Sequence, residues 1–125
     1  MKGSKKGFTL AELMLAAAIM AIAVAALLQL LIVCLISNTT ASNQVVAAND
    51  AQYVLEKIKG LPYSDIDTCT FPSFTFNNLV DEQVSFSKCA NVDNMKEVTV
   101  KVKWKERNAD KEFQLSTRFA ETSFE

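Results

Sequence analysis

The most constraining feature of this chain is an apolar run from Leu13 to Ile36, in which only Gln29 is polar. As a helix, a run of that length extends for about 36 Å, enough to cross the ~30 Å hydrocarbon core of a bilayer. Three lysines precede the run, in residues 1–7, and basic residues beside a span stay on the cytoplasmic side. The sequence therefore predicts one membrane-spanning segment, residues 8–36, with residues 37–125 exported.

One carboxylate, Glu12, lies at the start of this predicted span. An acidic side chain in hydrocarbon is costly, and where one occurs it usually has a function. We therefore expect a positively charged partner that neutralises Glu12.

Three kinds of N-terminal segment could contain such a run, and the flanking residues separate them. A secretory signal has a shorter apolar core followed by a small-x-small cleavage site, which residues 39–41 match poorly. A lipoprotein signal has a small residue before the modified cysteine, whereas Cys34 follows Val33. An uncleaved single-span anchor fits the length of the run but leaves Glu12 unexplained.

The residues from Gly7 to Glu12 read Gly-Phe-Thr-Leu-Ala-Glu, after a basic segment and before the span. This arrangement resembles the class III signal of type IV pilins and type II secretion pseudopilins. The resemblance implies that residues 1–7 are a leader, and that a prepilin peptidase cuts between Gly7 and Phe8 and then methylates Phe8. It also implies that Glu12 attracts the N-terminal amine of a neighbouring subunit, so that two charges that are costly in lipid neutralise each other.

The same resemblance implies the partners and the location of the protein. The partners are the prepilin peptidase and methyltransferase, other pilins or pseudopilins, an inner-membrane assembly platform and the lipid bilayer. The expected location is the inner membrane, with the N-terminus cytoplasmic and residues 37–125 periplasmic, and then a pilus or pseudopilus. Three of the 13 basic residues lie in residues 1–7, so the remainder is acidic and predicts no specific binding of nucleic acid.

Cysteine usage agrees with export. Cys69 and Cys89 lie in the part predicted to be exported, and the alternative to a disulfide between them is two free thiols. A disulfide is favoured, because an oxidising compartment permits it and closing a loop of that size contributes about 3 kcal/mol. The chain has no histidine and no recognisable catalytic arrangement. We therefore expect no zinc site, no other cofactor and no enzymatic activity.

The spacing of apolar residues after the span predicts that the helix continues. The residues that recur at intervals of three and four are Ala47, Ala51, Val54, Leu55 and Ile58. Although residues 37–43 are poor helix formers, we expect one helix from Phe8 to Lys59, stopped by Gly60-Leu61-Pro62.

Beyond the helix the apolar period changes to two. Apolar residues alternate with polar ones at Val98, Val100, Val102 and Trp104, and again at Phe113, Leu115, Thr117 and Phe119. The pattern predicts an antiparallel hairpin over residues 97–119, with a turn at 106–110 and an apolar face that the helix covers. Shorter strands are expected near Ser73–Asn77 and Gln83–Ser87. The predicted fold class is α+β and pilin-like, a long N-terminal helix packed on a small antiparallel sheet.

Several polar residues and one tryptophan on or near this sheet allow two interpretations. Trp104 could bind a ligand, but its place on the valine face favours the core. The lysines at 101, 103 and 105 could form an interaction surface, but a solvated strand face that discourages aggregation is favoured. Five acidic residues lie in the predicted loops: Asp65, Asp67, Asp81, Glu82 and Asp93. They lack the spacing of a calcium-binding loop.

A second resemblance concerns the type of subunit. Residues 53–66, together with 98–104 and 115–118, look like V-type minor pilins, called pilus modification proteins, and the I-type minor pseudopilin. Gln29 stands where many major pilins have proline, and the cysteine pair precedes the hairpin instead of framing the C-terminal region. We therefore expect a minor subunit that assembles into or primes a type IV pilus or type II secretion pseudopilus. The alternatives are a major subunit of a thin filament, or a filament-tip adhesin or DNA-uptake module.

Overall fold

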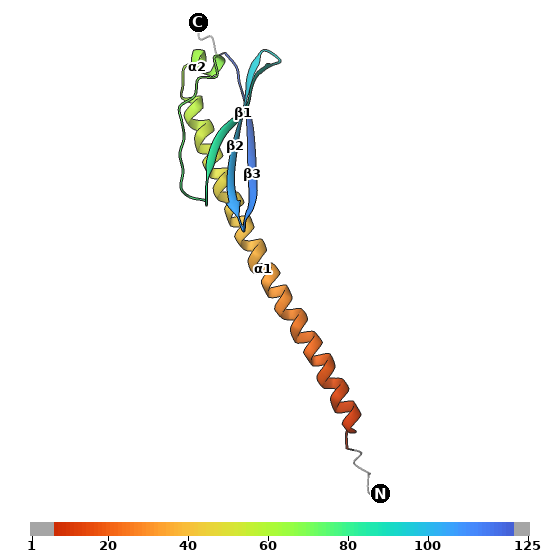
Figure 1. Cartoon of the computed structure of the whole chain (residues 1–125). Helices are drawn as coiled ribbons and strands as arrows, with labels where there is room; N and C mark the ends of the chain where they lie inside the picture. The colour runs from red at the N-terminus through yellow and green to blue at the C-terminus, as the bar shows by residue number, and fades with distance from the viewer. Residues whose placement is uncertain (1–6, 122–125) are drawn as a thin grey trace. The chain divides into compact units, whose positions relative to one another are not determined.

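The computed structural model describes residues 7–121. The elements follow one another as α1 (Leu10–Lys59), α2 (Tyr63–Asp67), β1 (Gln83–Val92), β2 (Met95–Glu106) and β3 (Ala109–Phe119) (Figure 1). The chain divides into two compact units between Thr39 and Thr40, and α1 contributes to both. The predicted α+β class, a long N-terminal apolar helix and a small antiparallel sheet, is confirmed.

In the first unit, α1 exposes a continuous run of apolar side chains from Leu13 to Ile36, interrupted only by Gln29. Leu13 is 64% exposed and Leu31 is 59% exposed, and the residues around them are similarly uncovered. A helix with such a surface needs lipid or other apolar helices around it, because exposing that much apolar surface to water is unfavourable. By length and composition, α1 is the one helix among the described residues that could cross a membrane.

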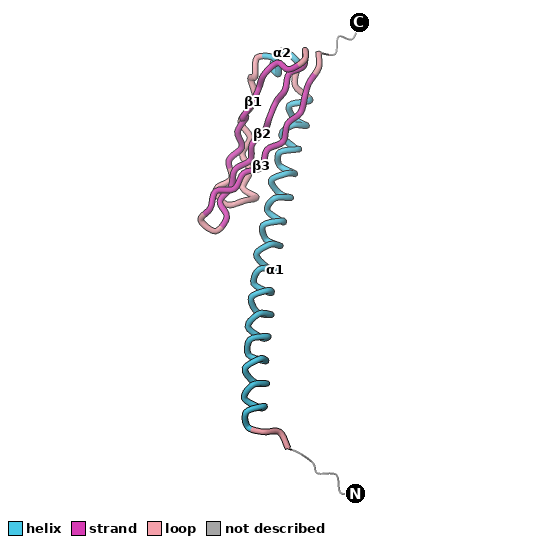
Figure 2. The backbone as a smooth tube through the Cα atoms, turned by 90° about the vertical axis from the view of Figure 1, so that its right-hand side faces the viewer, coloured by secondary structure: helices cyan, strands magenta, loops and turns pink. Residues whose placement is uncertain are grey.

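In the second unit, residues 40–59 of α1 cover one face of a three-stranded antiparallel sheet with the order β1-β2-β3 (Figure 2). The helix contributes four fully buried side chains, Ala47, Ala51, Val54 and Ile58. Alternate positions of β2 contribute Val98, Val100, Val102 and Trp104. These are the positions that the spacing predicted, and Trp104 lies in the core with 3% of its surface exposed.

The predicted end of α1 at Lys59 is confirmed, but its start and the residue that stops it differ from the prediction. The helix begins at Leu10 and not at Phe8, because Thr9 occupies the capping position. At the other end, the amides of Gly60 and Leu61 bond to carbonyls one turn back, at 3.2 and 2.9 Å. Gly60 does not adopt the left-handed conformation that often ends a helix. The stop is better explained by Pro62, which has no amide hydrogen to continue the helical bonds.

Both hairpins close through two-residue turns in which both central residues have positive φ. The values are 51° and 62° at Asp93-Asn94, and 48° and 65° at Arg107-Asn108. Turns of this kind match the twist of antiparallel strands, and Asn and Asp tolerate the conformation better than most residues. The predicted hairpin over 97–119 is present, although β2 begins earlier, at Met95, and its turn is narrower than 106–110.

The predicted strand at Ser73–Asn77 is wrong. These residues lie in an irregular loop, in which Phe71 and Phe74 pack on Phe86 with ring centroids 4.6 and 6.4 Å apart. Aromatic residues favour strands because they pack well on a half-buried surface. Here the same tendency is satisfied by packing from a loop, without a ladder of backbone hydrogen bonds.

The predicted strand at Gln83–Ser87 is too short, since β1 continues to Val92 with a bulge between Phe86 and Lys88. Cys89 therefore lies in a strand, and a disulfide joins it to Cys69 with the Cα atoms 6.2 Å apart. This bond fastens the chain after α2 to the sheet. The buried Lys96 adds a second attachment, because its Nζ donates to the carbonyl oxygen of Asp67 at 2.6 Å.

Ile58→Ala should lower the free energy of unfolding by about 2–5 kcal/mol, because truncating a fully buried side chain leaves a cavity between helix and sheet. Fluorescence of Trp104, the one tryptophan of the chain, would follow denaturant unfolding in detergent. Val45→Ala is the matched control: Val45 lies on the same helix and is 60% exposed. Val45→Ala should lower the free energy of unfolding by about 0.5 kcal/mol or less. Equal losses for the two variants would contradict the assigned core.

Candidate processing and assembly site

Gly7, Phe8 and Glu12 lie at the N-terminal end of α1 and are all exposed. Gly7 and Phe8 precede the helix, and Phe8 is 88% exposed. Glu12 lies in the first turn of the helix. The lysines expected in the leader, Lys2, Lys5 and Lys6, lie outside the described residues.

The fold gives no reason for a glycine at position 7. A Cβ atom added to Gly7 would meet nothing within 4 Å, and its φ is not in the left-handed region. A larger side chain would therefore fit the described structure. A requirement for glycine at this position would come from a second molecule that approaches the backbone closely.

Glu12 is held by a reciprocal set of hydrogen bonds with Thr9. The amide of Thr9 donates to Oε2 of Glu12 at 2.9 Å, and the hydroxyl of Thr9 donates to the same oxygen at 3.1 Å. In return, the amide of Glu12 donates to the hydroxyl oxygen of Thr9 at 3.3 Å. This is a capping box, which satisfies amides that a helix start leaves without partners. Thr9 was missed in the sequence analysis, although the Thr-x-x-Glu spacing is a recognisable signal for it.

The capping box gives Glu12 a local role and also fixes the position of its charge. Both bonds from Thr9 reach Oε2, and within residues 7–121 Oε1 accepts no hydrogen bond, so it can accept one from another molecule. The carboxylate also lies at the positive end of the helix dipole, which favours its ionised form. The arrangement can therefore present a carboxylate oxygen to an ammonium group at the start of an otherwise apolar helix.

In the second unit, Glu106 binds the beginning of the helical segment that covers the sheet. The hydroxyl of Thr40 and the side-chain amide of Asn43 both donate to its carboxylate, the latter at 3.0 Å. These two bonds hold the pKa of Glu106 below its ordinary value. Residues 37–43 have low helix propensity, and two of their polar side chains instead attach the helix to the β2–β3 turn.

A second polar cluster joins α1 to the loop before β1. The side-chain amide of Asn78 donates to both oxygens of the buried Asp50, each at 3.1 Å. Oε2 of Glu82 accepts from the amides of Asn78 and Leu79, whereas Oε1 is buried without a partner. Burial raises the pKa of Glu82, and the neighbouring carboxyl group of Asp50 raises it further.

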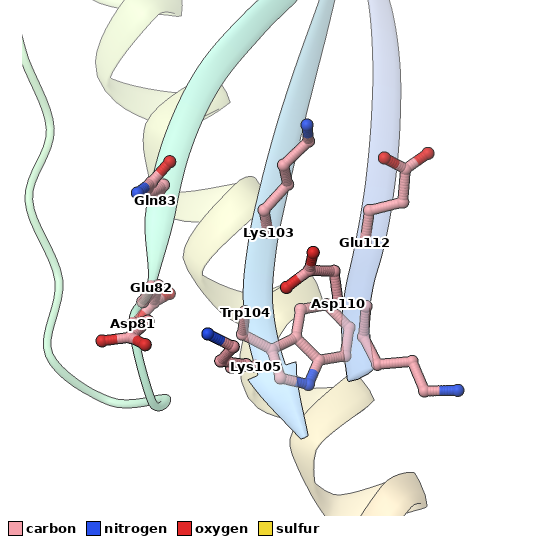
Figure 3. Close-up of a pocket in the computed structure, with 9 residues that line it drawn as sticks. Asp81, Glu82, Gln83, Lys103, Trp104, Lys105, Asp110 and Glu112 are labelled. Carbon is pink, nitrogen blue, oxygen red and sulfur yellow. The ribbon is translucent and has the colours of Figure 1, made fainter. Parts of the chain in front are cut away.

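An open groove lies near the turn end of the sheet. Figure 3 shows acidic side chains on the loop before β1 and on β3, with lysines of β2 between them. The charged residues that line the groove are Asp81, Glu82, Lys103, Lys105, Asp110, Lys111 and Glu112. Carboxylates and ammonium groups are interspersed, so the groove does not concentrate either sign of charge. Of the three lysines on the outer sheet face, Lys101 is paired with Glu112 at 3.4 Å.

The other acidic residues considered in the sequence analysis remain dispersed. Asp65 and Asp67 lie in α2, and Asp93 lies in the β1–β2 turn. Within residues 7–121, no three histidine, cysteine, aspartate or glutamate side chains gather in a way that could hold a metal ion.

Residues 2–28 match the family model described as the prokaryotic N-terminal methylation motif. The matched segment contains Gly7, Phe8, Thr9 and Glu12, and it extends into the apolar part of α1. Comparisons with curated proteins and with solved structures found no match.

Glu82→Gln should raise the free energy of unfolding near pH 7 and change it little below about pH 4, where a glutamate is protonated in any case. Because the pKa of Glu82 is higher in the folded state, its contribution is fully present at acidic pH and is lost as the pH rises through the folded pKa. Denaturant titrations at pH 4 and pH 7 would measure the difference. Glu56→Gln, on the exposed face of α1, is the control. A loss of stability at pH 7 for Glu82→Gln would contradict the assignment.

Proposed function

We propose that this chain, which carries the N-terminal signature of type IV pilins and pseudopilins, is a minor subunit of a type IV pilus or a type II secretion pseudopilus. Its work is structural and not catalytic. It is cleaved between Gly7 and Phe8, methylated at Phe8, and then assembled with other subunits of the same superfamily. The match of residues 2–28 to the methylation motif carries this proposal.

The surroundings of Gly7 support the cleavage step. A Cβ atom at position 7 would meet nothing within 4 Å in the described structure, so the fold does not explain the glycine. A peptidase that binds the extended backbone on both sides of the scissile bond would explain it, because a side chain there would obstruct the approach. The exposure of Phe8 leaves the bond accessible.

The proposed topology is a single span with the N-terminus in the cytoplasm and the second unit in the periplasm of the inner membrane. The leader lysines favour this orientation. The exposed apolar surface of α1 supports insertion in lipid. The disulfide between Cys69 and Cys89 suits an oxidising compartment.

Assembly would use the apolar part of α1 in two ways. Its alanines lower the bulk of the helix, so that neighbouring helices can approach closely; they are Ala16, Ala17, Ala18, Ala21, Ala23, Ala25 and Ala26. The carboxylate of Glu12 would bind the N-terminal amine that cleavage creates on a neighbouring subunit. An ammonium and a carboxylate are each costly in lipid, and pairing removes most of that cost.

The assignment as a minor subunit depends on features outside the methylation motif. Gln29 stands where a proline is common in major pilins, and the disulfide ties the chain just after α2 to β1 instead of framing the C-terminal region. The segment from Tyr53 to Ile66 and the strand residues 98–104 favour the same assignment by their likeness to minor subunits.

The mass of the intact protein, purified from membranes of a strain that contains a prepilin peptidase, tests the proposal directly. A chain that begins at Phe8 and carries one additional methyl group would support it. A full-length chain would contradict it and leave an uncleaved single-span anchor.

Gly7→Val should block cleavage, because the peptidase would meet a branched side chain beside the scissile bond, whereas the fold tolerates the change. Immunoblots that separate precursor from mature protein would measure the effect. Ser4→Val, in the same leader, is the control and should be processed normally. Cleavage of Gly7→Val at the usual rate would contradict the assigned site.

Glu12→Ala should leave the protein processed and anchored but poorly incorporated into filaments, because the amine of the neighbouring subunit loses its partner. The fraction of the protein in sheared filaments would measure incorporation. Glu12→Gln separates charge from capping, since the amide oxygen can still accept the bonds from Thr9. If Glu12→Gln assembled normally while Glu12→Ala did not, capping and not charge pairing would be the role of this residue.

A further inference from the structure

The β2–β3 turn holds the sheet against α1 close to the end of the apolar run. Glu106, the last residue of β2, accepts hydrogen bonds from the side chains of Thr40 and Asn43. Thr40 follows Ile36, where the apolar run ends, by only four residues. The turn is therefore attached to the chain almost directly after the proposed span.

The covalent chain limits the distance between this turn and a bilayer. The four residues from Ile36 to Thr40 extend for about 6 Å as a helix and for at most about 14 Å when fully stretched. This limit holds at any angle between the two units, because it depends only on the length of the chain. Each headgroup layer of a bilayer is about 5–8 Å thick. With the apolar run in the hydrocarbon core, Thr40 and the turn that binds it therefore lie at the level of the headgroups or just above them.

The charged side chains that the turn exposes are mainly basic. Residues 105–111 include four exposed charged side chains, of which only Asp110 is acidic. The three basic ones are Lys105, Arg107 and Lys111. Glu106 is buried, and its carboxylate is occupied by its bonds to α1. The outward surface of the turn therefore carries an excess of positive charge.

Several basic residues further along the sheet already have carboxylate partners within 4 Å. They are Lys88, Lys96, Lys101 and Arg118. The basic residues of the turn differ from them. Within residues 7–121, Lys105, Arg107 and Lys111 form no ion pair with a carboxylate. These three cations are therefore available to an anion outside the chain.

An exposed apolar side chain lies beside these cations. The backbone carbonyl of Val80 accepts a hydrogen bond from the amide of Lys105 at 2.8 Å, and Val80 is 68% exposed. Asp81, next in the chain, adds a second carboxylate to this surface. A soluble anion would bind the cations but leave Val80 in water. A headgroup layer, in contrast, offers phosphates to the cations, ammonium groups to the carboxylates and apolar carbon to the valine.

We propose that the β2–β3 turn docks on the bilayer surface from which α1 emerges, with Lys105 and Arg107 binding the phosphate groups of lipid headgroups. Val80 lies at the same surface and contacts the apolar part of the lipids. This inference rests on the proposed function, because it requires α1 to span a membrane. The contact holds the second unit against the bilayer before assembly, and extraction of the chain into a filament breaks it.

Fluorescence quenching at two matched positions tests where the turn lies. Asn108 and Asn94 are each the second residue of a two-residue turn, at opposite ends of β2. Asn108→Cys and Asn94→Cys are made in full-length Cys34→Ala protein and labelled with bimane. The labelled proteins are reconstituted into vesicles of phosphatidylethanolamine and phosphatidylglycerol that include a lipid with a nitroxide on its headgroup. We expect at least ~3-fold more quenching at position 108, because position 94 is separated from the proposed span by the length of the sheet. Equal quenching at the two positions would overturn the inference. Protein that does not float with the vesicles would overturn the proposed span, and the inference with it.

Charge variants test whether phosphate binding holds the turn at the bilayer. Lys105→Gln combined with Arg107→Gln removes two positive charges from the turn. Lys57→Gln combined with Lys59→Gln is the matched control, because it removes two exposed positive charges from the last turn of α1. In the labelled Asn108→Cys protein we expect the first pair to lower quenching at least ~2-fold and the second pair to leave it unchanged. Quenching that the first pair does not change, or that both pairs lower equally, would overturn the inference.

Discussion

A single helix has to satisfy two environments, and the rest of the structure follows from that constraint. Up to Thr39, α1 exposes apolar side chains, whereas from Thr40 onward it buries one stripe against the sheet. The buried stripe is partly alanine, at Ala47 and Ala51, so the helix can lie close to the valines of β2. Only this stripe can be covered by a sheet of three strands, and the remaining apolar surface of α1 requires lipid or neighbouring helices.

Polar side chains place the sheet on the helix as specifically as the apolar core does. Glu106 binds Thr40 and Asn43 near the beginning of the second unit, and Asn78 binds Asp50 further along the helix. Apolar contacts alone would permit the sheet to slide somewhat along the buried stripe of the helix, whereas each of these hydrogen bonds forms at only one position of the sheet. The exception is Glu82, whose Oε1 is buried without a partner among the described residues; burial and the neighbouring carboxyl group of Asp50 raise its pKa.

The periodic parts of the fold were predictable from the sequence, and the parts defined by single contacts were not. Intervals of three and four identified the buried stripe of α1, and the alternation of valine with lysine identified β2 and the place of Trp104. Ser73–Asn77 was misassigned, because aromatic residues that suit a strand can equally pack from a loop. The candidate processing and assembly site was recognised in the sequence from Gly7, Phe8 and Glu12. The capping role of Thr9 was not, because it depends on reciprocal hydrogen bonds with Glu12 that apolar periodicity cannot show.

The capping role of Glu12 and its proposed pairing with a neighbouring amine are compatible. Cleavage between Gly7 and Phe8 would leave the Phe8–Thr9 peptide bond intact, so the Thr9 amide that donates to Glu12 would survive processing. Both Thr9 donors use Oε2 and leave Oε1 for an incoming ammonium. Because the cap already holds the carboxylate in place, pairing would cost less side-chain entropy than it would for a freely rotating glutamate. The helix start therefore prepares the acid for the partner that its proposed position in a membrane would require.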